Sequence, residues 1–233
     1  MYSTSKLWLL LASGPVLFFL SFAALSVMFS IAGTPAAQIP EKVAAFVPHC
    51  LVVVLGCVGL LMLTMKAEVL HAWKLPAVSA FAGDLLIGAV SGGLLAVLYF
   101  KWLGPAMEGL QRTFGDYVPP GSILPTLSGN MAVFFIANVI LAPLVEETLY
   151  RGIALPALGN TLGPVVAIVI SCMAFGLLHW AGGFWYMLLT GVIAGGAFAA
   201  LYYLRGGLLA PFAAHFVLNL IEFAHAALSR GDS

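Results

Sequence analysis

The chain has 233 residues, of which 62% are hydrophobic and only 8% are charged, and its mean hydropathy is +1.08. A soluble domain carries about 25% charged residues, so this chain cannot cover itself with a hydrated surface and the bilayer must be its solvent. Nine basic and nine acidic side chains give a formal net charge of zero, which argues against a nucleic-acid partner.

A helix that crosses a bilayer needs about 20 mostly apolar residues. Several stretches qualify, and the intervals between them hold most of the charges and many prolines. The stretches are residues 7–31, 44–65, 81–103, 129–155, 162–180, 184–204 and 208–228. Open strands would leave backbone groups without hydrogen-bond partners in lipid. The predicted fold class is therefore all-α, a polytopic transmembrane helical bundle with about seven spanning helices.

The N-terminal stretches carry few polar signals. The stretch 7–31 is longer than the about 7–15 residues of a signal-peptide core, so we expect a spanning helix. In the stretch 81–103, Gly88-x-x-x-Gly92 places small residues on one face, as Gly191-x-x-x-Gly195 does later, and we interpret both as helix packing. The connection 104–128 is the longest, and we expect a short interfacial helix within it.

The fourth stretch leads into a cluster of charges at Glu146, Glu147 and Arg151. Each charge at the centre of a spanning helix costs about 2.5–3.5 kcal/mol on insertion scales, which indicates a function. Residues four apart share a helix face, so Glu147 and Arg151 are predicted to form an ion pair. Glu146 points about 100° away, towards the face of Tyr150. It is then free to accept a proton from water, as a general base does. The alternative is an ordinary helix end, with Arg151 reaching for the interface.

Two histidines lie in separate apolar stretches further along the chain. His179 follows Phe175 by four residues and shares its helix face, and His215 and Asn219 have the same relation. A lone histidine near a helix end is more often a satisfied interfacial residue. Two histidines and an amide beside a carboxylate pair instead predict a site that binds a water and stabilises an oxyanion.

Other polar side chains rank lower. Glu222 falls seven residues after His215, on roughly the same face, and is a candidate supporting residue. Asp84 is expected to act near a helix N-terminus. The remaining histidines, which we expect at the membrane interface, are His49, His71 and His225.

Together the three motifs Glu-Glu-x-x-x-Arg, Phe-x-x-x-His and His-x-x-x-Asn resemble those of the CAAX prenyl protease type II and bacteriocin-processing family, the glutamic-type intramembrane endopeptidases. The resemblance covers residues 129–228, which we expect to form the protease core, while residues 1–128 supply N-terminal helices and a connecting loop. It implies peptide hydrolysis within the membrane. It assigns water activation to Glu146, and binding of the water and oxyanion to His179, His215 and Asn219. Glu147, Arg151 and Phe175 would orient the site.

A metal is the alternative to a water activated by glutamate alone. Two histidines and one glutamate are a zinc-like ligand set. No His-Glu-x-x-His occurs in the sequence, and the resemblance points to glutamate, so we expect no metal and no other cofactor.

Depth within the membrane poses a difficulty. At about 1.5 Å per residue, Glu146 and His215 would lie about 13 and 10 Å deep, but His179 about 25 Å. We nevertheless predict that these side chains converge within about 10 Å, through tilted or broken helices.

The expected partners are the lipid bilayer and a membrane-embedded or lipidated protein or peptide substrate. Candidates include a prenylated C-terminus, a bacteriocin or signalling peptide, and a C-terminal sorting tail. We expect a multi-pass protein in the plasma membrane of a prokaryote. One alternative is a non-proteolytic immunity or scaffold protein that keeps the family fold. Another is a transporter or channel with a proton-relay carboxylate, which the absence of paired broken helices in two matching halves of the sequence disfavours.

Overall fold

The computed structural model describes residues 4–119 and 130–228, and these parts of the chain are helical without any strand. The helices in chain order are α1 (Thr4–Ile31), α2 (Ile39–Ala45), α3 (Val47–Met62), α4 (Lys66–Ala72), α5 (Val78–Leu98), α6 (Gly104–Phe114), α7 (Met131–Phe134), α8 (Ala142–Glu147), α9 (Leu155–Leu162), α10 (Pro164–Leu178), α11 (Phe184–Leu189), α12 (Gly195–Arg205) and α13 (Leu209–Leu228). Four π-helical turns join α5 to α6, α7 to α8, α8 to α9 and α11 to α12. They are Tyr99–Leu103, Phe135–Leu141, Thr148–Ala154 and Thr190–Ala194.

Within the described ranges, six helices are long and apolar enough to cross a membrane. The all-α polytopic bundle is confirmed, and the count is close to the expected seven. The stretch 162–180 differs because it forms only α10, a helix of 15 residues. At about 1.5 Å per residue such a helix is about 22 Å long, short of the about 30 Å of a hydrocarbon core. It starts late because Gly163, at a φ of 84°, turns the chain before Pro164.

The connection 104–128 contains a short helix, α6, but this helix is not separate from α5. The π-helical turn Tyr99–Leu103 carries α5 directly into α6, so that one helical stretch runs from Val78 to Phe114. Residues 120–128 of this connection, with Pro120 and Gly121, lie outside the described residues.

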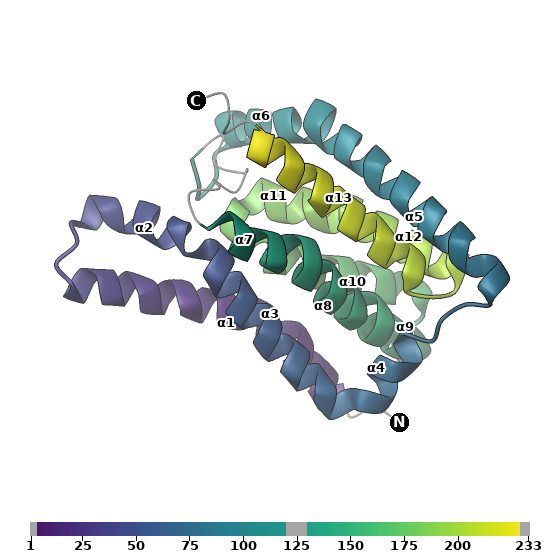
Figure 1. Ribbon diagram of the computed structural model, residues 1–233. Coiled ribbons are helices and arrows are strands. Elements are labelled where there is room, and N and C mark those ends of the chain that lie inside the picture. The colour runs from purple at the N-terminus through teal and green to yellow at the C-terminus, as the bar shows by residue number, and fades with distance from the viewer. Residues whose placement is uncertain (1–3, 120–129, 229–233) are drawn as a thin grey trace.

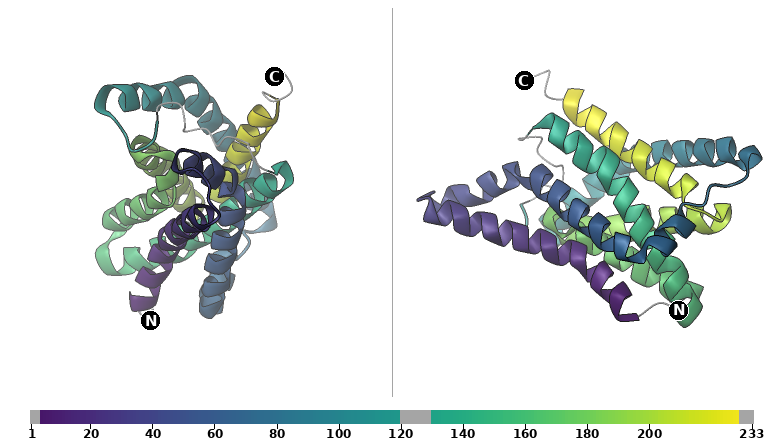
Figure 2. Two further views of the ribbon diagram at one scale, coloured as in Figure 1. Left: turned by 90° about the vertical axis from the view of Figure 1, so that its left-hand side faces the viewer. Right: turned by 60° about the horizontal axis from the view of Figure 1, so that its bottom comes forward.

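The helices form a row with a second group behind it. In Figure 1 the row runs from α5 through α13 and the α7–α8 stretch to α3, and α10 and α12 lie behind it. The α1–α2–α3 end projects from the bundle as an arm, which Figure 1 and the right view of Figure 2 show. Large apolar side chains are exposed on the outside of the helical bundle, for example Leu60, Leu94 and Leu204. Such side chains suit a lipid environment.

Glycines permit two close helix crossings. Added Cβ atoms at Gly88 and Gly92 of α5 would overlap the backbone of α13 at Ala210 and Ala214. At the second crossing, a Cβ at Gly191 would lie 2.8 Å from the carbonyl oxygen of Cys172 in α10. The interpretation of both small-residue patterns as packing faces is confirmed.

The helix that carries the charged motif lies at the centre of the bundle. Every residue of the π-helical turn Thr148–Ala154 is buried. This turn contacts α1, α4, α10 and α12. The most expensive polar residues of the chain are therefore placed inside protein, away from lipid.

Asp84 has a different role from the expected one. It is the seventh residue of α5, beyond the first turn, and its Oδ1 lies 2.6 Å from both Nε and Nη2 of Arg205 at the end of α12. The expectation of a helix N-terminal role was wrong, because it used only neighbours along the chain. Asp84 instead links two spanning helices.

Candidate active site

The buried carboxylate of Glu147 joins the first and third motifs. Arg151 Nη1 donates to Glu147 Oε1 at 3.1 Å, which confirms the predicted ion pair. His215 Nδ1 lies 2.8 Å from the same oxygen. Both Glu147 and Arg151 are 0% exposed. Since an ionised carboxylate only accepts, Nδ1 of His215 carries the hydrogen, and Nε2 is the ring atom left for a ligand.

The Arg151 guanidinium is held from three further directions. Its Nη2 donates to the carbonyl oxygen of Gly195 at 2.9 Å. Its central carbon lies 4.5 Å from the ring centre of Phe175 and 5.4 Å from that of Phe198, within cation–π range. A Cβ at Gly195 would lie 3.4 Å from Nη2, so the glycine permits this approach. Arg151 thereby connects the motif helix to α10 and α12.

Phe175 lies between the two motif histidines. Its ring centre is 4.8 Å from that of His179 and 5.8 Å from that of His215. His179 Nδ1 donates to the Phe175 carbonyl oxygen at 2.9 Å, which leaves Nε2 free to accept. The predicted convergence is confirmed for the two histidines. The depth count misplaced the end of the helical stretch that holds Glu146, because this stretch continues through α9 to Leu162. Glu146 lies 16 residues, about 24 Å, before that end, which is comparable to the about 22 Å of α10 that precede His179.

Asn219 ties α13 to the start of the motif helix. Its Nδ2 donates to the carbonyl oxygen of Asn138 at 2.7 Å. Asn138 belongs to the π-helical turn Phe135–Leu141, where the wider i→i+5 pattern changes which carbonyls the helix satisfies. An amide has two N–H groups, so the second remains for a ligand.

His179, His215 and Asn219 line one cavity together with Phe175 and Glu222. The cavity offers about 40 Å³ to the centres of water molecules. One water needs about 10–15 Å³ on that measure, so the cavity can hold a small group of waters. The other histidines of the chain, His49, His71 and His225, line neither this cavity nor the one described next.

Glu146 is not in that cavity. It is 3% exposed and lines a second, smaller space between the motif helix, α1 and α3, with Tyr150, Gly14 and Val58. Glu146 also interacts electrostatically with Tyr186, whose ring lies 5.8 Å from that of His179 in the larger cavity. The two spaces are therefore neighbours. The structure brings Glu147, rather than Glu146, into contact with a motif histidine.

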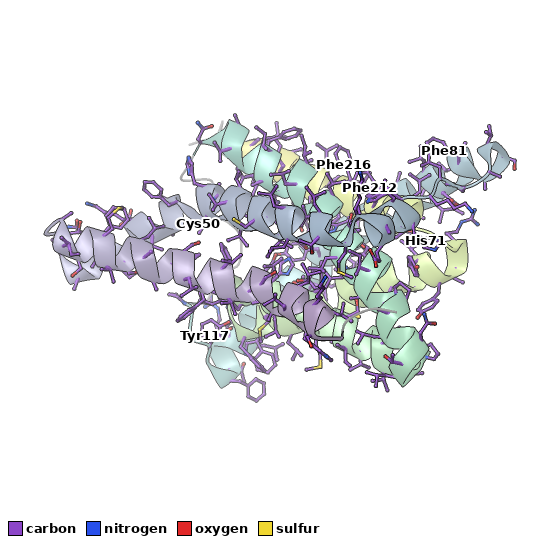
Figure 3. The ribbon with its side chains drawn as sticks, turned by 90° about the horizontal axis from the view of Figure 1, so that it is seen from below. Cys50, His71, Phe81, Tyr117, Phe212 and Phe216 are labelled. Atoms are coloured by element: carbon purple, nitrogen blue, oxygen red, sulfur yellow. The ribbon has the colours of Figure 1, made fainter. Side chains whose placement is uncertain are left out.

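Several contacts of the site were not predicted from the sequence. The ring of Phe198 stacks on His215 at 4.8 Å. Trp73, after α4, donates from Nε1 to Thr148 Oγ1 at 2.8 Å and packs on Phe212, which Figure 3 labels with its neighbour Phe216. Phe198 lies one helical turn after Gly195, so a search along the small-residue face could have found it. Nothing near Trp73 in the sequence predicts its contact.

Residues 4–119 and 130–228 contain no group of three or more His, Cys, Asp or Glu side chains arranged to hold a metal ion. The donors of the motifs are instead engaged with one another, since Glu147 binds Arg151 and His215.

Residues 128–221 match the family model of the type II CAAX prenyl endopeptidases, Rce1-like. The matched segment contains all three motifs, and the resemblance predicted from them is confirmed. No curated protein and no solved structure matches the chain.

Proposed function

We propose that the protein is an intramembrane endopeptidase that uses a water activated by Glu146, because residues 128–221 match the Rce1-like family of type II CAAX prenyl endopeptidases. The observation that carries this proposal is the hydrogen bond of Glu147 to both Arg151 and His215. It joins motifs that are 68 residues apart in one buried polar site, beside a cavity large enough for water.

Glu146 is the carboxylate best placed to act as the base. Glu147 Oε1 is occupied by a guanidinium and an imidazole. Glu147 Oε2, Glu146 Oε2 and the Tyr150 hydroxyl are all buried without a hydrogen-bond partner among the described residues. Glu146 differs from Glu147 in that it forms none of the ion pairs found in the described structure, and it lies beside Tyr150. Glu146 and Tyr150 line a space in which about 10 Å³ is open to the centre of a water molecule. This is close to the about 10–15 Å³ that one water requires. A water there would satisfy Glu146 Oε2 and the Tyr150 hydroxyl and would face a base.

Hydrolysis then proceeds with each group in one role. Glu146 takes a proton from the water, and the water oxygen attacks the carbonyl carbon of the scissile bond. The second N–H of Asn219 would stabilise the oxyanion, while Nε2 of His179 and Nε2 of His215 orient the water. When the carbon–nitrogen bond breaks, the leaving amine takes the proton back from Glu146. The scissile carbonyl must therefore lie where the two spaces meet.

The substrate is a protein or peptide that reaches the site from the bilayer. We propose a membrane-embedded or lipidated chain, cleaved near the membrane surface, and no metal cofactor. The protein is an integral multi-pass membrane protein, and we place it in the plasma membrane of a prokaryote on the resemblance of its motifs. Non-proteolytic binding by the same fold is the competing outcome.

Mass spectrometry of membrane peptides from cells with the wild-type protein and with Glu146→Ala tests the proposal. We expect at least one peptide product that depends on Glu146, with equal levels of the two proteins, and continued product formation by purified protein in a strong chelator. Identical peptide profiles with an intact phenotype would favour the binding role. Loss of activity that only zinc restores would contradict the metal-free mechanism.

A further inference from the structure

The larger cavity contains a carboxylate that the proposed mechanism does not use. Glu222 of α13 lines it, and Glu222 is the only Asp, Glu, Lys or Arg among the described lining residues. The ion pairs found in the described parts of the chain leave Glu222 without a Lys, Arg or His partner. Asp84 and Glu147, in contrast, each have an arginine. Glu222 is half-buried in this wall. A carboxylate withdrawn from water without a cation is costly, and a cationic ligand would offset that cost.

Two tyrosines accompany Glu222 in the cavity wall. Tyr99 begins the π-helical turn after α5, and Tyr186 lies in α11. Both tyrosines line the same cavity as Glu222. A carboxylate next to aromatic rings can bind a cation through a charge-assisted hydrogen bond and through the ring faces. Three separate helical stretches thus place one carboxylate and two phenol rings in the wall of the same cavity.

Other side chains of the cavity wall are mostly apolar, and Thr190 adds a hydroxyl that forms a hydrogen bond with Tyr186. The apolar side chains include Leu95, Leu103 and Met107. A lysine or arginine side chain has a long hydrocarbon stem below its charged group, and such stems pack against apolar surface. The wall and the carboxylate therefore fit a long basic side chain better than a small inorganic cation.

The position of Glu222 relates it to the reaction. It lies three residues after Asn219 and seven after His215 on the same helix, which is about 4.5 and 10.5 Å along the axis. An extended peptide advances about 3.3 Å per residue. A side chain one to three residues from a bond held at His215 and Asn219 would reach Glu222.

We propose that Glu222, Tyr99 and Tyr186 form a subsite that binds a lysine or arginine side chain of the substrate within about three residues of the scissile bond. The subsite deepens the proposed endopeptidase function and rests on it for the identity of the ligand as a substrate side chain. The cation-binding site itself does not depend on proteolysis, so the two can be tested apart.

The first experiment measures cleavage preference in proteoliposomes. An acyl-anchored peptide library with randomised positions is cleaved by the wild type, Glu222→Gln and Glu222→Lys, and products are sequenced by mass spectrometry. We expect the wild type to enrich lysine and arginine at one position near the cut. Glu222→Gln should lower kcat/KM for basic relative to neutral peptides at least tenfold, and Glu222→Lys should favour acidic residues there. Glu108→Gln, which alters an exposed ion pair with Arg112, is the matched control and should keep the wild-type preference.

The second experiment measures binding in a Glu146→Gln background, where the proposed base is absent. N-octanoylagmatine carries a guanidinium on an acyl chain, and N-butyloctanamide is its neutral counterpart. We expect only the guanidinium probe to raise the melting temperature, and adding Glu222→Gln should weaken its apparent affinity at least tenfold.

Two results would overturn the subsite. One is equal binding of the guanidinium probe by the background protein with and without the added Glu222→Gln change. The other is a basic preference in the first experiment that Glu222→Gln leaves unchanged. Binding that depends on Glu222 without any library cleavage would uphold the subsite and contradict the endopeptidase.

Discussion

Glu147 and Arg151 show at the scale of single residues how a membrane protein tolerates buried charge. Each side chain is fully buried, and each has partners on other helices in addition to the ion pair between them. Breaking such a pair leaves one charge uncompensated, which costs about 3–5 kcal/mol. The pair is therefore a structural requirement of the site as well as part of its chemistry.

This reasoning predicts the outcome of removing Arg151. Arg151→Met should lower the free energy of unfolding in detergent by about 3–5 kcal/mol, because Glu147 stays buried without its guanidinium. The double variant Glu147→Gln with Arg151→Met should lose less than the sum of the two single changes. Additive losses would show that the two side chains do not stabilise each other.

Tyr150 provides a prediction about the proposed water. Its hydroxyl is buried and unpaired within the described structure, so Tyr150→Phe should leave the free energy of unfolding nearly unchanged. If the hydroxyl holds the water that Glu146 activates, kcat should fall about tenfold or more while KM changes little. Steady-state kinetics with a cleaved peptide measure both values. A wild-type kcat would remove Tyr150 from the water site.

At the scale of helices, the crossing of α5 and α13 offers a matched pair of glycines. A Cβ at Gly92 would overlap the Ala214 carbonyl of α13, whereas a Cβ at Gly93 has no heavy atom within 4 Å in the described structure. Gly92→Ala should lower the free energy of unfolding by about 1–3 kcal/mol through overpacking. Gly93→Ala should be neutral or stabilising, because alanine favours the helix. Equal effects of the two variants would contradict the close crossing.

The start of α11 is held by a carboxylate from the loop after α6. Asp116 Oδ1 accepts from the N–H of Phe184 at 2.8 Å, and Oδ2 accepts from that of Trp185 at 3.4 Å. These are N–H groups that a helix start leaves without internal partners. Tyr117 adds a bond from its hydroxyl to the Trp180 carbonyl, and Figure 3 labels its position at the bundle surface. The loop thereby caps a helix that lines the larger cavity.

This cap should depend on pH. Burial alone would raise the pKa of Asp116, but the hydrogen bonds, led by that from Phe184, outweigh it and hold the pKa below its ordinary value. The stabilisation is therefore present above the unfolded pKa of about 3.9 and is lost as the pH falls through the lower folded value. The wild type should melt above Asp116→Asn at pH 7, and the difference should shrink below about pH 4. A difference in melting temperature that persists unchanged into strong acid would contradict the cap.

At the scale of the whole molecule, hydropathy predicted the spanning segments well, because lipid demands long apolar helices. Helical spacing also predicted the Glu147–Arg151 pair, since that contact lies within one helix. Polar contacts between different helices could not be predicted from the sequence. Asp84 pairs with Arg205 because α5 and α12 come together in the fold. Asn219 bonds to Asn138 because α13 lies beside the turn Phe135–Leu141.

The placement of the site shows the same limit. A count of residues along ideal helices separated His179 from Glu146 in depth because it ended the fourth stretch at residue 155, whereas the helical stretch continues to Leu162. His179 lies beside Phe175, whose ring also approaches His215. Spacing separated Glu146 from Glu147 correctly. It gave no sign that Glu146 would face α1 and α3 while Glu147 faces the histidines, because that depends on the packing around the central helix.

The most direct test of the central claim compares Glu146→Gln and Glu147→Gln in proteoliposomes with a cleaved peptide. If Glu146 activates the water, Glu146→Gln should lower kcat by about a thousandfold or more while the free energy of unfolding stays within about 1 kcal/mol of the wild type. Glu147→Gln should lower both quantities, since Arg151 and His215 lose their shared acceptor. A folded Glu146→Gln protein that cleaves at the wild-type rate would contradict the account.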